Sequence, residues 1–283
     1  MNLKIPKILI TGYGGLLAPY LVDVASNIGN VITTGRKSGQ VLCDLSNSKE
    51  VKLMLEDIRP NLVIHAAGMT NVDECENNFI KADISNHIIA DNIAKYLPKT
   101  EKLAFISTDQ VYPNKEGPHK ENEIGPINVY GQTKYQGELA ILKHPQSVVI
   151  RTNLFGHSQT CGRISIDDFV INNLRSKNKI TLFTDIFFSP LHMKTLSSMI
   201  FKILNSKYIG VINLGSREGM TKAEFGIEVA KHKGISTESV SFGKSNIMPG
   251  RAPRIHDLRL DVTLAESILN CSMPTLQQEI FKL

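Results

Sequence analysis

The stretch KILITGYGGLLA, residues 7–18, decides the fold that this sequence predicts. Its apolar run at positions 8–11 is typical of a strand, and the pattern from Ala18 onward is typical of a helix. Glycines spaced Gly12-x-x-Gly15-x-x-Ala18 let the backbone turn sharply and approach a pyrophosphate at the helix N-terminus. A glycine-rich turn alone is often only a turn, but its place between a strand and a helix predicts a nucleotide-binding loop. The residues assigned to this loop are Gly12, Gly14, Gly15 and Leu16.

Apolar runs alternate with amphipathic stretches through the first half of the chain. The runs expected to form strands cover residues 8–11, 31–34, 62–66, 103–107 and 148–151. Strands that alternate with helices at this spacing are typical of βαβ units around a parallel sheet. The sequence therefore predicts an α/β fold of the Rossmann type, in which a doubly wound parallel sheet has helices on both faces.

The pattern loosens in the second half, where a different organisation is expected. A helix is predicted near residues 166–175, and capping boxes that begin at Thr221 and Thr275 predict two later helices. We expect a dinucleotide-binding core at residues 1–155. We expect residues 156–283 to form mainly a smaller α/β lobe that binds substrate, with some strands and helices returning to the core.

The composition excludes several classes of protein. The chain has 283 residues, of which 42% are hydrophobic and 21% charged, and a net charge of +5. Lysines and arginines are scattered, which argues against a nucleic-acid partner. No apolar run approaches the roughly 18 residues of a membrane span. The four cysteines are far apart and form no C-x-x-C pair, so we expect no metal site, no disulfide framework and a cytoplasmic location.

The end of the second predicted strand indicates which dinucleotide binds. An acidic residue there would accept from the ribose 2′-hydroxyl of NAD, whereas a basic residue accommodates the 2′-phosphate of NADP. Arg36 therefore favours NADPH, with NADH possible if Arg36 is only a surface arginine. Asp44 comes a few residues later. It either accepts a hydrogen bond from the adenine amino group or caps the helix that begins near residues 46–48.

Tyr130 and Lys134 carry the main chemical prediction. Their spacing of four places a phenol and an ammonium one turn apart on the same face of a helix. A nearby positive charge favours the ionised phenol and so lowers its pKa from a reference of about 10. Such a tyrosine exchanges a proton with a sugar or alcohol oxygen near neutral pH. The pair arises often by chance, so the prediction depends on agreement elsewhere in the chain.

Several further segments resemble one family, in the order in which that family has them. They are PNLVIHAAG at 60–68, TNVDECE at 70–76, ISTDQVY at 106–112 and PINVYGQTKYQGE at 126–138. With the glycine loop, they resemble the extended short-chain dehydrogenase/reductase superfamily. Within it, the chain is most similar to the dTDP-4-dehydrorhamnose reductase (sugar-nucleotide reductase) family.

The resemblance implies a role for each matching residue. Tyr130 would protonate a carbonyl oxygen as hydride arrives, and Lys134 would lower its pKa and hold the nicotinamide ribose. Thr108 would hydrogen-bond the same oxygen, unless it is an ordinary hydroxyl that caps a turn. Besides the glycine loop, the implied cofactor contacts are Arg36, Asp44, Leu45, Ala66, Ala67, Gly68, Tyr130 and Lys134. The implied substrate contacts are Thr108, Asp109, Asn153 and Arg251, the last of which would pair with a diphosphate.

Absences narrow the expected reaction. Related dehydratases carry a glutamate where this chain has Gln110, which cannot exchange a proton at neutral pH. The relatives that epimerise before they reduce use a cysteine, and positions 108 and 109 offer none. The chain also departs from the rhamnose-pathway pattern, because Asn153-Leu154 replaces a serine and a tryptophan. This departure puts the sugar in question, and the metal-linked dimer of some relatives is not carried over.

We therefore expect an NADPH-dependent reductase of a 4-keto-6-deoxy nucleotide sugar, active as a monomer or homodimer in surface polysaccharide or nucleotide-sugar biosynthesis. Two alternatives stay open. The regulatory subunit of methionine adenosyltransferase also resembles this family and keeps the Tyr-x-x-x-Lys pair, so a non-catalytic NADP-binding protein is one. An NAD-dependent sugar-nucleotide epimerase is the other, and Arg36 argues against it.

Overall fold

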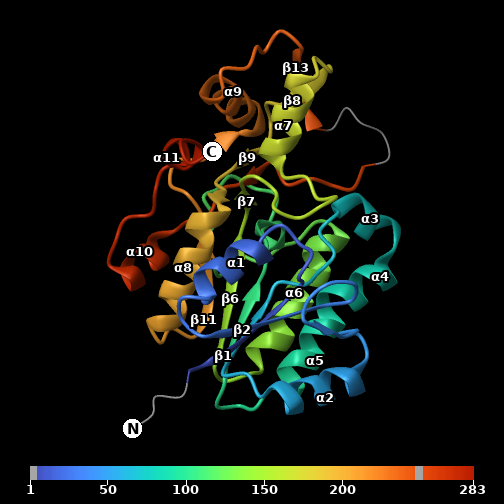
Figure 1. Ribbon diagram of the computed structural model, residues 1–283. Coiled ribbons are helices and arrows are strands. Elements are labelled where there is room, and N and C mark those ends of the chain that lie inside the picture. Colours follow the sequence, from blue (N-terminus) through green and yellow to red (C-terminus); the bar gives the residue numbers. More distant parts are fainter. Residues whose placement is uncertain (1–4, 246–250) are drawn as a thin grey trace.

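A parallel sheet of seven strands forms the centre of the computed structural model, which describes residues 5–245 and 251–283 (Figure 1). The strand order is β11-β6-β5-β4-β1-β2-β3. The strands are β1 (Lys7–Thr11), β2 (Asn30–Gly35), β3 (Val41–Leu42), β4 (Leu62–His65), β5 (Lys102–Ile106), β6 (Ser147–Thr152) and β11 (Gly210–Leu214). The order reverses between β1 and β4, which is the place where doubly wound sheets open a ligand crevice at their carboxyl ends. The predicted Rossmann-type sheet is confirmed.

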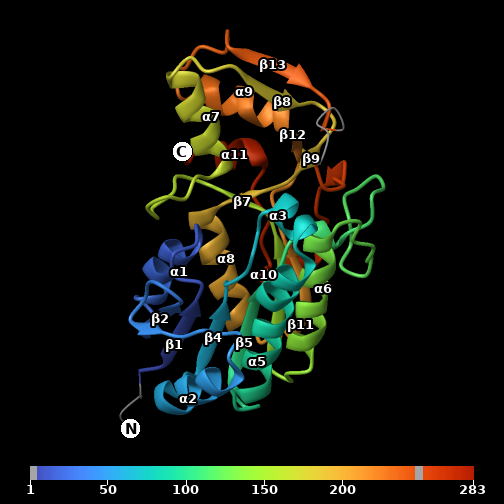
Figure 2. The ribbon, with the colours of Figure 1, turned by 90° about the vertical axis from the view of Figure 1, so that its right-hand side faces the viewer.

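Helices cover both faces of this sheet (Figure 2). The face that bears α1 has a core that includes Leu21, Ile200 and Ile212. The opposite face, which bears α6, has a core that includes Val51, Ile93 and Ile141. The helices of the first face are α1 (Ala18–Ala25), α8 (Met193–Asn205) and α10 (Thr263–Leu269), and those of the second are α2 (Ser48–Ile58), α5 (Ile89–Tyr96) and α6 (Val129–Leu142).

Short elements lie between β4 and α6. The helices α3 (Val72–Asn77) and α4 (Phe79–Asp83) lead into a π-helical turn, η1 (Ile84–Ile88), which continues directly into α5. A 3₁₀ turn, η2 (Asp109–Val111), follows β5. The turn η1, helix α3 and turn η2 all pack against α6, so they surround the helix that carries Tyr130.

The remaining elements form a lobe over the carboxyl ends of the central strands (Figure 1). Its hydrophobic core includes Phe155, Phe188 and Phe225, whose rings pack edge to face. Its helices are α7 (Ile166–Arg175), α9 (Lys222–His232) and α11 (Leu276–Ile280). Its strands are β7 (Leu154–Phe155), β8 (Ile180–Phe183), β9 (Phe187–Phe188), β10 (Leu191–His192), β12 (Met220–Thr221), β13 (Val240–Gly243) and β14 (Asp257–Leu258).

The helix starts in the lobe follow the sequence signals. Helix α7 has the predicted bounds, and the capping boxes predicted at Thr221 and Thr275 begin α9 and α11. The chain leaves the lobe to form α8, β11 and α10 against the sheet. The domain boundary at residue 155 stays a prediction.

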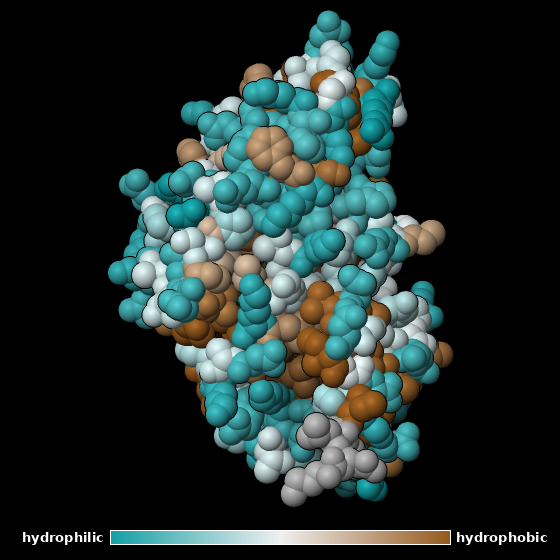
Figure 3. Space-filling model, turned by 60° about the vertical axis from the view of Figure 1, so that its left-hand side comes forward, coloured by the Kyte–Doolittle hydropathy of each residue, from teal (hydrophilic) through white to brown (hydrophobic). Residues whose placement is uncertain are grey.

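The surface differs between the two parts of the molecule. On the face seen in Figure 3, hydrophilic side chains cover most of the lobe, whereas apolar side chains gather on the part that contains the sheet. Among the described residues, no helix combines the length and the apolarity needed to cross a membrane.

Candidate active site

The glycine loop lies at the reversal of strand order. Gly12 follows β1 directly and has φ of +80°, a conformation that L side chains rarely adopt. A Cβ atom at Gly12 would lie 2.7 Å from the nitrogen of Ala67 and 2.8 Å from the carbonyl oxygen of Ala66. Only glycine therefore lets the loop after β1 pack against the turn after β4. The structure brings these two predicted cofactor segments together at the head of the crevice.

The next part of the loop points toward the end of β2. Gly14 has φ of +109°, and a Cβ atom there would lie 2.9 Å from the Ser38 hydroxyl oxygen. Leu17 stands at the N-cap of α1 and has no side-chain acceptor for the first backbone N–H groups. A helix that begins in this way offers its N–H groups and its dipole to an anion such as a pyrophosphate.

Arg36 follows β2 and Asp44 follows β3, where we expect the adenosine end of a dinucleotide to bind. Arg36 is exposed just after β2, and Asp44 is close enough for its pKa to be lowered, chiefly by hydrogen bonds from Ser46 and less by Arg36. Asn47, not Asp44, caps α2, since its side chain accepts from the backbone of residues 49 and 50. The alternative in which Asp44 caps this helix is therefore wrong. Its contact with adenine stays a prediction, as does that of the neighbouring Leu45.

Helix α6 is held close to its neighbours by two glycines. A Cβ atom at Gly131 would lie 2.1 Å from the carbonyl oxygen of Gln110 in η2. A Cβ atom at Gly137 would lie 2.3 Å from the carbonyl oxygen of Asn86 in η1. No larger residue fits at either position without moving the helix. The close approach to η2 fixes the first turn of α6, and with it Tyr130, relative to the end of β5.

The Tyr130 side chain is buried, with 8% of its surface exposed, beside Cys75 and Ala82. Burial raises the pKa of its phenol, and the Thr108 hydroxyl opposes this rise. A net lowering of this pKa was expected from the Lys134 spacing alone, and that expectation is wrong. The reason is desolvation, which a sequence spacing does not report. The phenol is thus protonated at neutral pH and able to act as an acid.

Lys134 lies one turn further along α6 and faces the sheet. Its ammonium donates to the carbonyl oxygen of Ile106 at 2.6 Å and lies 3.9 Å from the centroid of the Phe105 ring. Burial lowers the pKa of Lys134 to about 7, and the charge of Glu138 partly opposes that. A Cβ atom at Gly68 would be 3.9 Å from the Lys134 nitrogen, so Lys134 borders the cofactor turn after β4.

Two buried polar residues support this arrangement. Asn86 accepts a hydrogen bond from the Met69 N–H at 2.8 Å and donates to the Thr133 hydroxyl at 3.1 Å, so it joins the turn after β4 to α6. His65, at the end of β4, shares a 2.7 Å hydrogen bond with the Thr11 hydroxyl at the end of β1. Burial, together with the charge of Lys134, lowers the pKa of His65 to about 3, so this imidazole is neutral.

Thr108 caps a turn, as one of its two predicted roles required, while its contact with a substrate oxygen stays a prediction. Its hydroxyl accepts from the Gln110 N–H at 3.2 Å, so it caps η2, and it also faces Tyr130. The next residue, Asp109, is buried and accepts a hydrogen bond from the Asn153 side chain. Burial raises the pKa of Asp109, while Asn153 and the charge of Lys222 lower it. Three predicted substrate residues therefore meet at the end of β5.

Three cations, Lys222, Arg251 and Arg254, lie near one another, and Lys222 lies near Asp109. Arg251 lies 3.7 Å from the Asp73 carboxylate, and Arg254 lies 2.8 Å from the same group. Burial lowers the pKa of Lys222, and Asp109 opposes that. Lys222 and Arg254 were not predicted as site residues. A sequence signal existed for Lys222, because a lysine at the first position of a helix opposes the helix dipole and calls for a nearby anion.

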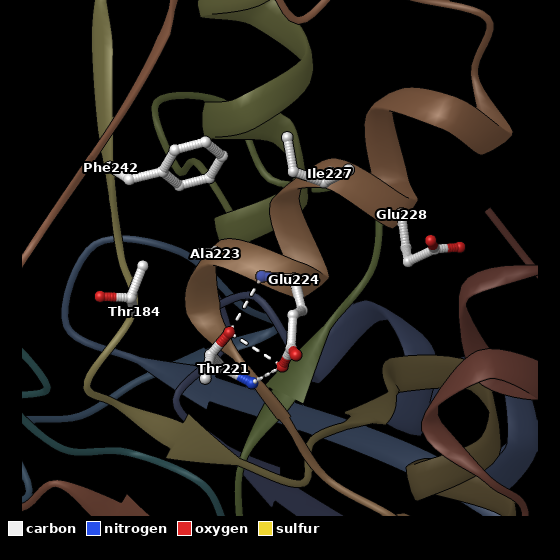
Figure 4. A pocket seen from close by; sticks show the side chains of 7 residues that line it. All are labelled: Thr184, Thr221, Ala223, Glu224, Ile227, Glu228 and Phe242. Atoms are coloured by element: carbon white, nitrogen blue, oxygen red, sulfur yellow. Dashed lines mark hydrogen bonds between the residues drawn. The ribbon is translucent and has the colours of Figure 1, made fainter.

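A cavity of about 370 Å³ lies elsewhere, in the lobe (Figure 4). The residues that line it are Thr184, Thr221, Ala223, Glu224, Ile227, Glu228 and Phe242. Thr221 and Glu224 bond to each other there in the capping box of α9. No predicted site residue lines this cavity. The described part of the chain also contains no group of three or more His, Cys, Asp or Glu side chains arranged to hold a metal ion.

Comparisons with known proteins agree with this geometry. The family model described as the RmlD substrate binding domain matches residues 6–283. The chain is 25% identical to the "Probable low-salt glycan biosynthesis reductase Agl14" of Haloferax volcanii, over 96% of this chain and 95% of that protein. It is 24% identical to methionine adenosyltransferase 2 subunit beta of Xenopus laevis, over 93% of this chain and 82% of that protein.

Solved structures share the whole fold. The hypothetical dTDP-4-dehydrorhamnose reductase from Sulfolobus tokodaii aligns with a TM-score of 0.86 and 28% identity, over 95% of this chain and 97% of that one. The dTDP-4-dehydrorhamnose reductase from Bacillus anthracis, solved in complex with NADP, aligns with a TM-score of 0.88 and 23% identity, over 100% of this chain and 98% of that one.

A Rossmann core in which a threonine, a tyrosine and a lysine meet at the carboxyl end of the fifth strand defines a class, the NAD(P)-dependent oxidoreductases of the extended short-chain type. Within that class, the chain belongs to the RmlD substrate-binding domain family, whose model covers nearly all of it. The resemblance drawn from the sequence motifs is confirmed.

Proposed function

We propose that this protein is an NADPH-dependent reductase of a 4-keto-6-deoxy nucleotide sugar. The observation that carries the proposal is the meeting of Thr108, Tyr130 and Lys134 at the carboxyl end of β5, beside the turn that packs on Gly12. With this placement, the buried Tyr130 phenol would donate its proton beside the nicotinamide ring.

Each of these residues has a separate role in the reduction. NADPH, when bound, supplies the hydride. Tyr130 gives its phenolic proton to the carbonyl oxygen, and the Thr108 hydroxyl donates a hydrogen bond to the same oxygen as negative charge grows on it. The Lys134 ammonium stabilises the phenolate that Tyr130 leaves behind. Burial of all three side chains excludes water and strengthens each of these interactions.

NADPH is favoured over NADH by the exposed Arg36 at the end of β2, whose guanidinium suits a 2′-phosphate. The expected pyrophosphate contacts are the N–H groups of Gly12, Gly14 and Leu16, at the uncapped start of α1. The N–H groups of Tyr13 and Gly15 already donate to the carbonyl oxygens of Thr34 and Gly12. The Bacillus anthracis reductase in complex with NADP has the same fold, which supports this choice. The four cysteines are free thiols, which fits a reaction in the cytoplasm.

Arg251, Arg254 and Lys222 supply the positive charge that a sugar-nucleotide diphosphate requires. Asp109 and Asn153 would meet the sugar hydroxyls. The Haloferax relative is described as a glycan biosynthesis reductase, which supports a role in the synthesis of a surface glycan.

A panel of dTDP-, UDP-, GDP- and CDP-linked 4-keto sugars tests the proposal, with loss of reduced-nicotinamide absorbance as the readout. We expect oxidation of NADPH by at least one substrate, and slower oxidation of NADH.

The relation to methionine adenosyltransferase 2 subunit beta favours one alternative, a protein that binds NADP without turnover. NADP binding with no oxidation by any member of the panel would support that alternative and contradict the proposal.

A further inference from the structure

Residues 251–254, which we call the arginine strap, run along the start of the catalytic helix. The Ala252 N–H donates to the Asp73 carboxylate at 2.9 Å, and the Pro253 carbonyl oxygen accepts from the Asn128 side chain at 3.1 Å. Asp73 also pairs with Arg254. The strap is therefore fastened at consecutive residues to two side chains of the core.

Asn128 connects the strap to the catalytic residue itself. It is the N-cap of α6, and its Oδ1 accepts from the Gly131 N–H at 2.8 Å. Its Nδ2 donates both to Pro253 and to the Gln110 side chain, the latter at 3.1 Å. One amide thus begins the catalytic helix two residues before Tyr130 and also holds the strap. A cap alone requires only the oxygen, so the nitrogen contacts call for a separate explanation.

The short helix α3 makes the second connection. Asp73, in its first turn, holds the strap, and Glu76, one turn later, accepts from the Val129 N–H at 2.9 Å. Between them, Cys75 is fully buried and packs against the Tyr130 ring. Helix α3 therefore contacts both the anion-binding arginines and the proton donor.

We propose that Asp73 and Asn128 are positioning residues that fix the spacing between the strap guanidinium groups and the Tyr130 phenol. This inference rests on the proposed function. A nucleoside diphosphate sugar would place its diphosphate on Arg251 and Arg254 and its carbonyl oxygen at Tyr130. A fixed spacing selects sugars whose carbonyl lies at the matching distance from the diphosphate, and it lowers the entropy cost of binding.

The way in which Asp73 binds the arginines leaves donors for a ligand. It faces Nε of Arg251 and Nη2 of Arg254, so the other guanidinium nitrogens point elsewhere. Nη1 of Arg254 is buried and has no hydrogen-bond partner among residues 5–245 and 251–283. Arginine has five donors in a planar fork, so one edge can be held by a carboxylate while another edge receives a phosphate.

Three variants and a control test the inference. Asp73→Ala removes every contact that Asp73 makes with the strap, whereas Asp73→Asn keeps an acceptor for the Ala252 N–H. Asn128→Asp keeps the cap oxygen but replaces the nitrogen that donates to Pro253. The control is Glu74→Gln. Glu74 lies beside Asp73 in the first turn of α3 and, within residues 5–245 and 251–283, pairs only with the exposed Lys81.

Two readouts are used: calorimetric titration of dTDP and UDP into the NADP-saturated protein, and the separate effects on KM and kcat for a reducible sugar nucleotide. We expect Asp73→Ala to weaken nucleoside diphosphate binding, and to raise KM, by about tenfold or more, which corresponds to the loss of one charge-assisted hydrogen bond. Asp73→Asn should lose less of the affinity for nucleoside diphosphate, because it keeps the acceptor for the Ala252 N–H. Asn128→Asp should raise KM and lower kcat, since it disturbs both the strap and the first turn of α6. NADP affinity and the control variant should stay within about twofold of wild type.

The inference is overturned if Asp73→Ala binds nucleoside diphosphate as the wild type does. It is equally overturned if Asp73→Asn binds it more tightly, because Asp73 would then only compete with the ligand for the arginines. The titrations need no turnover. Absence of any reductase activity therefore counts against the proposed function, and unaltered diphosphate binding counts against the strap.

Discussion

Replacement of Gly131 by alanine tests how closely the catalytic helix must approach η2. The new Cβ would lie 2.1 Å from the Gln110 carbonyl oxygen and 2.9 Å from its carbon, both of which are backbone atoms that cannot rotate away. Since real Cβ atoms do not come within 3.0 Å of other heavy atoms, the two backbones must separate by about 0.9 Å. That shift moves Tyr130 away from Thr108.

The expected cost follows from that distance. A misplacement of about 1 Å costs roughly 100-fold in rate, and overpacking of this kind costs about 1–3 kcal/mol of stability. The assay is kcat with a reducible sugar nucleotide and NADPH, together with a urea melt. Gly226→Ala in α9 is the matched control, because its Cβ would meet the tip of the flexible Leu182 side chain at 2.6 Å. A folded Gly131→Ala protein with kcat within about twofold of wild type would show that Tyr130 tolerates this separation of α6 from η2.

Three further predictions concern charge. Because burial holds the pKa of His65 near 3, the unfolded chain takes up a proton below its reference of about 6.5 and the folded protein does not. The free energy of unfolding should therefore fall by about 2 kcal/mol from this group between pH 7 and pH 5. If urea melts show that the free energy of unfolding of His65→Asn falls by as much as that of the wild type over this pH range, the prediction is wrong. Arg36→Ala should raise the KM for NADPH by about tenfold or more and leave the KM for NADH unchanged, whereas equal effects would show that Arg36 does not read the phosphate. Glu138→Gln should lower the free energy of unfolding by about 3–5 kcal/mol, since it leaves the buried Arg151 guanidinium without its charged partner. A loss below about 1 kcal/mol in denaturant melts would contradict this value for the ion pair.

The central sheet could be predicted from the sequence because its strands are buried on both faces and read as apolar runs. Residues 62–66 and 148–151 are examples, and β4 and β6 have nearly these bounds. Helix starts could be predicted where a side chain caps the helix, as at Thr221. The lobe strands β9 and β14 have two residues each, which is too short for any alternation to show.

The contents of the site could be predicted better than its electrostatics. Motif order indicated Thr108, Tyr130 and Lys134, and the fold brings them together. The direction of the Tyr130 pKa shift could not be predicted, because desolvation depends on packing by α3 and α4. The contacts of the strap with Asp73 and Asn128 could not be predicted from the sequence either, since these residues are more than 120 positions away from the strap. Long-range pairs of this kind leave no local pattern.

The most direct test of the proposed reaction uses NADPH that carries deuterium at the transferred position and measures the deuterium in the sugar product. We expect product from the wild type to carry deuterium at the former carbonyl carbon. We expect Tyr130→Phe to form this product at least about 100-fold more slowly while NADPH affinity stays within severalfold. Undiminished label transfer by Tyr130→Phe, or consumption of NADPH with no deuterium in the sugar, would contradict the account.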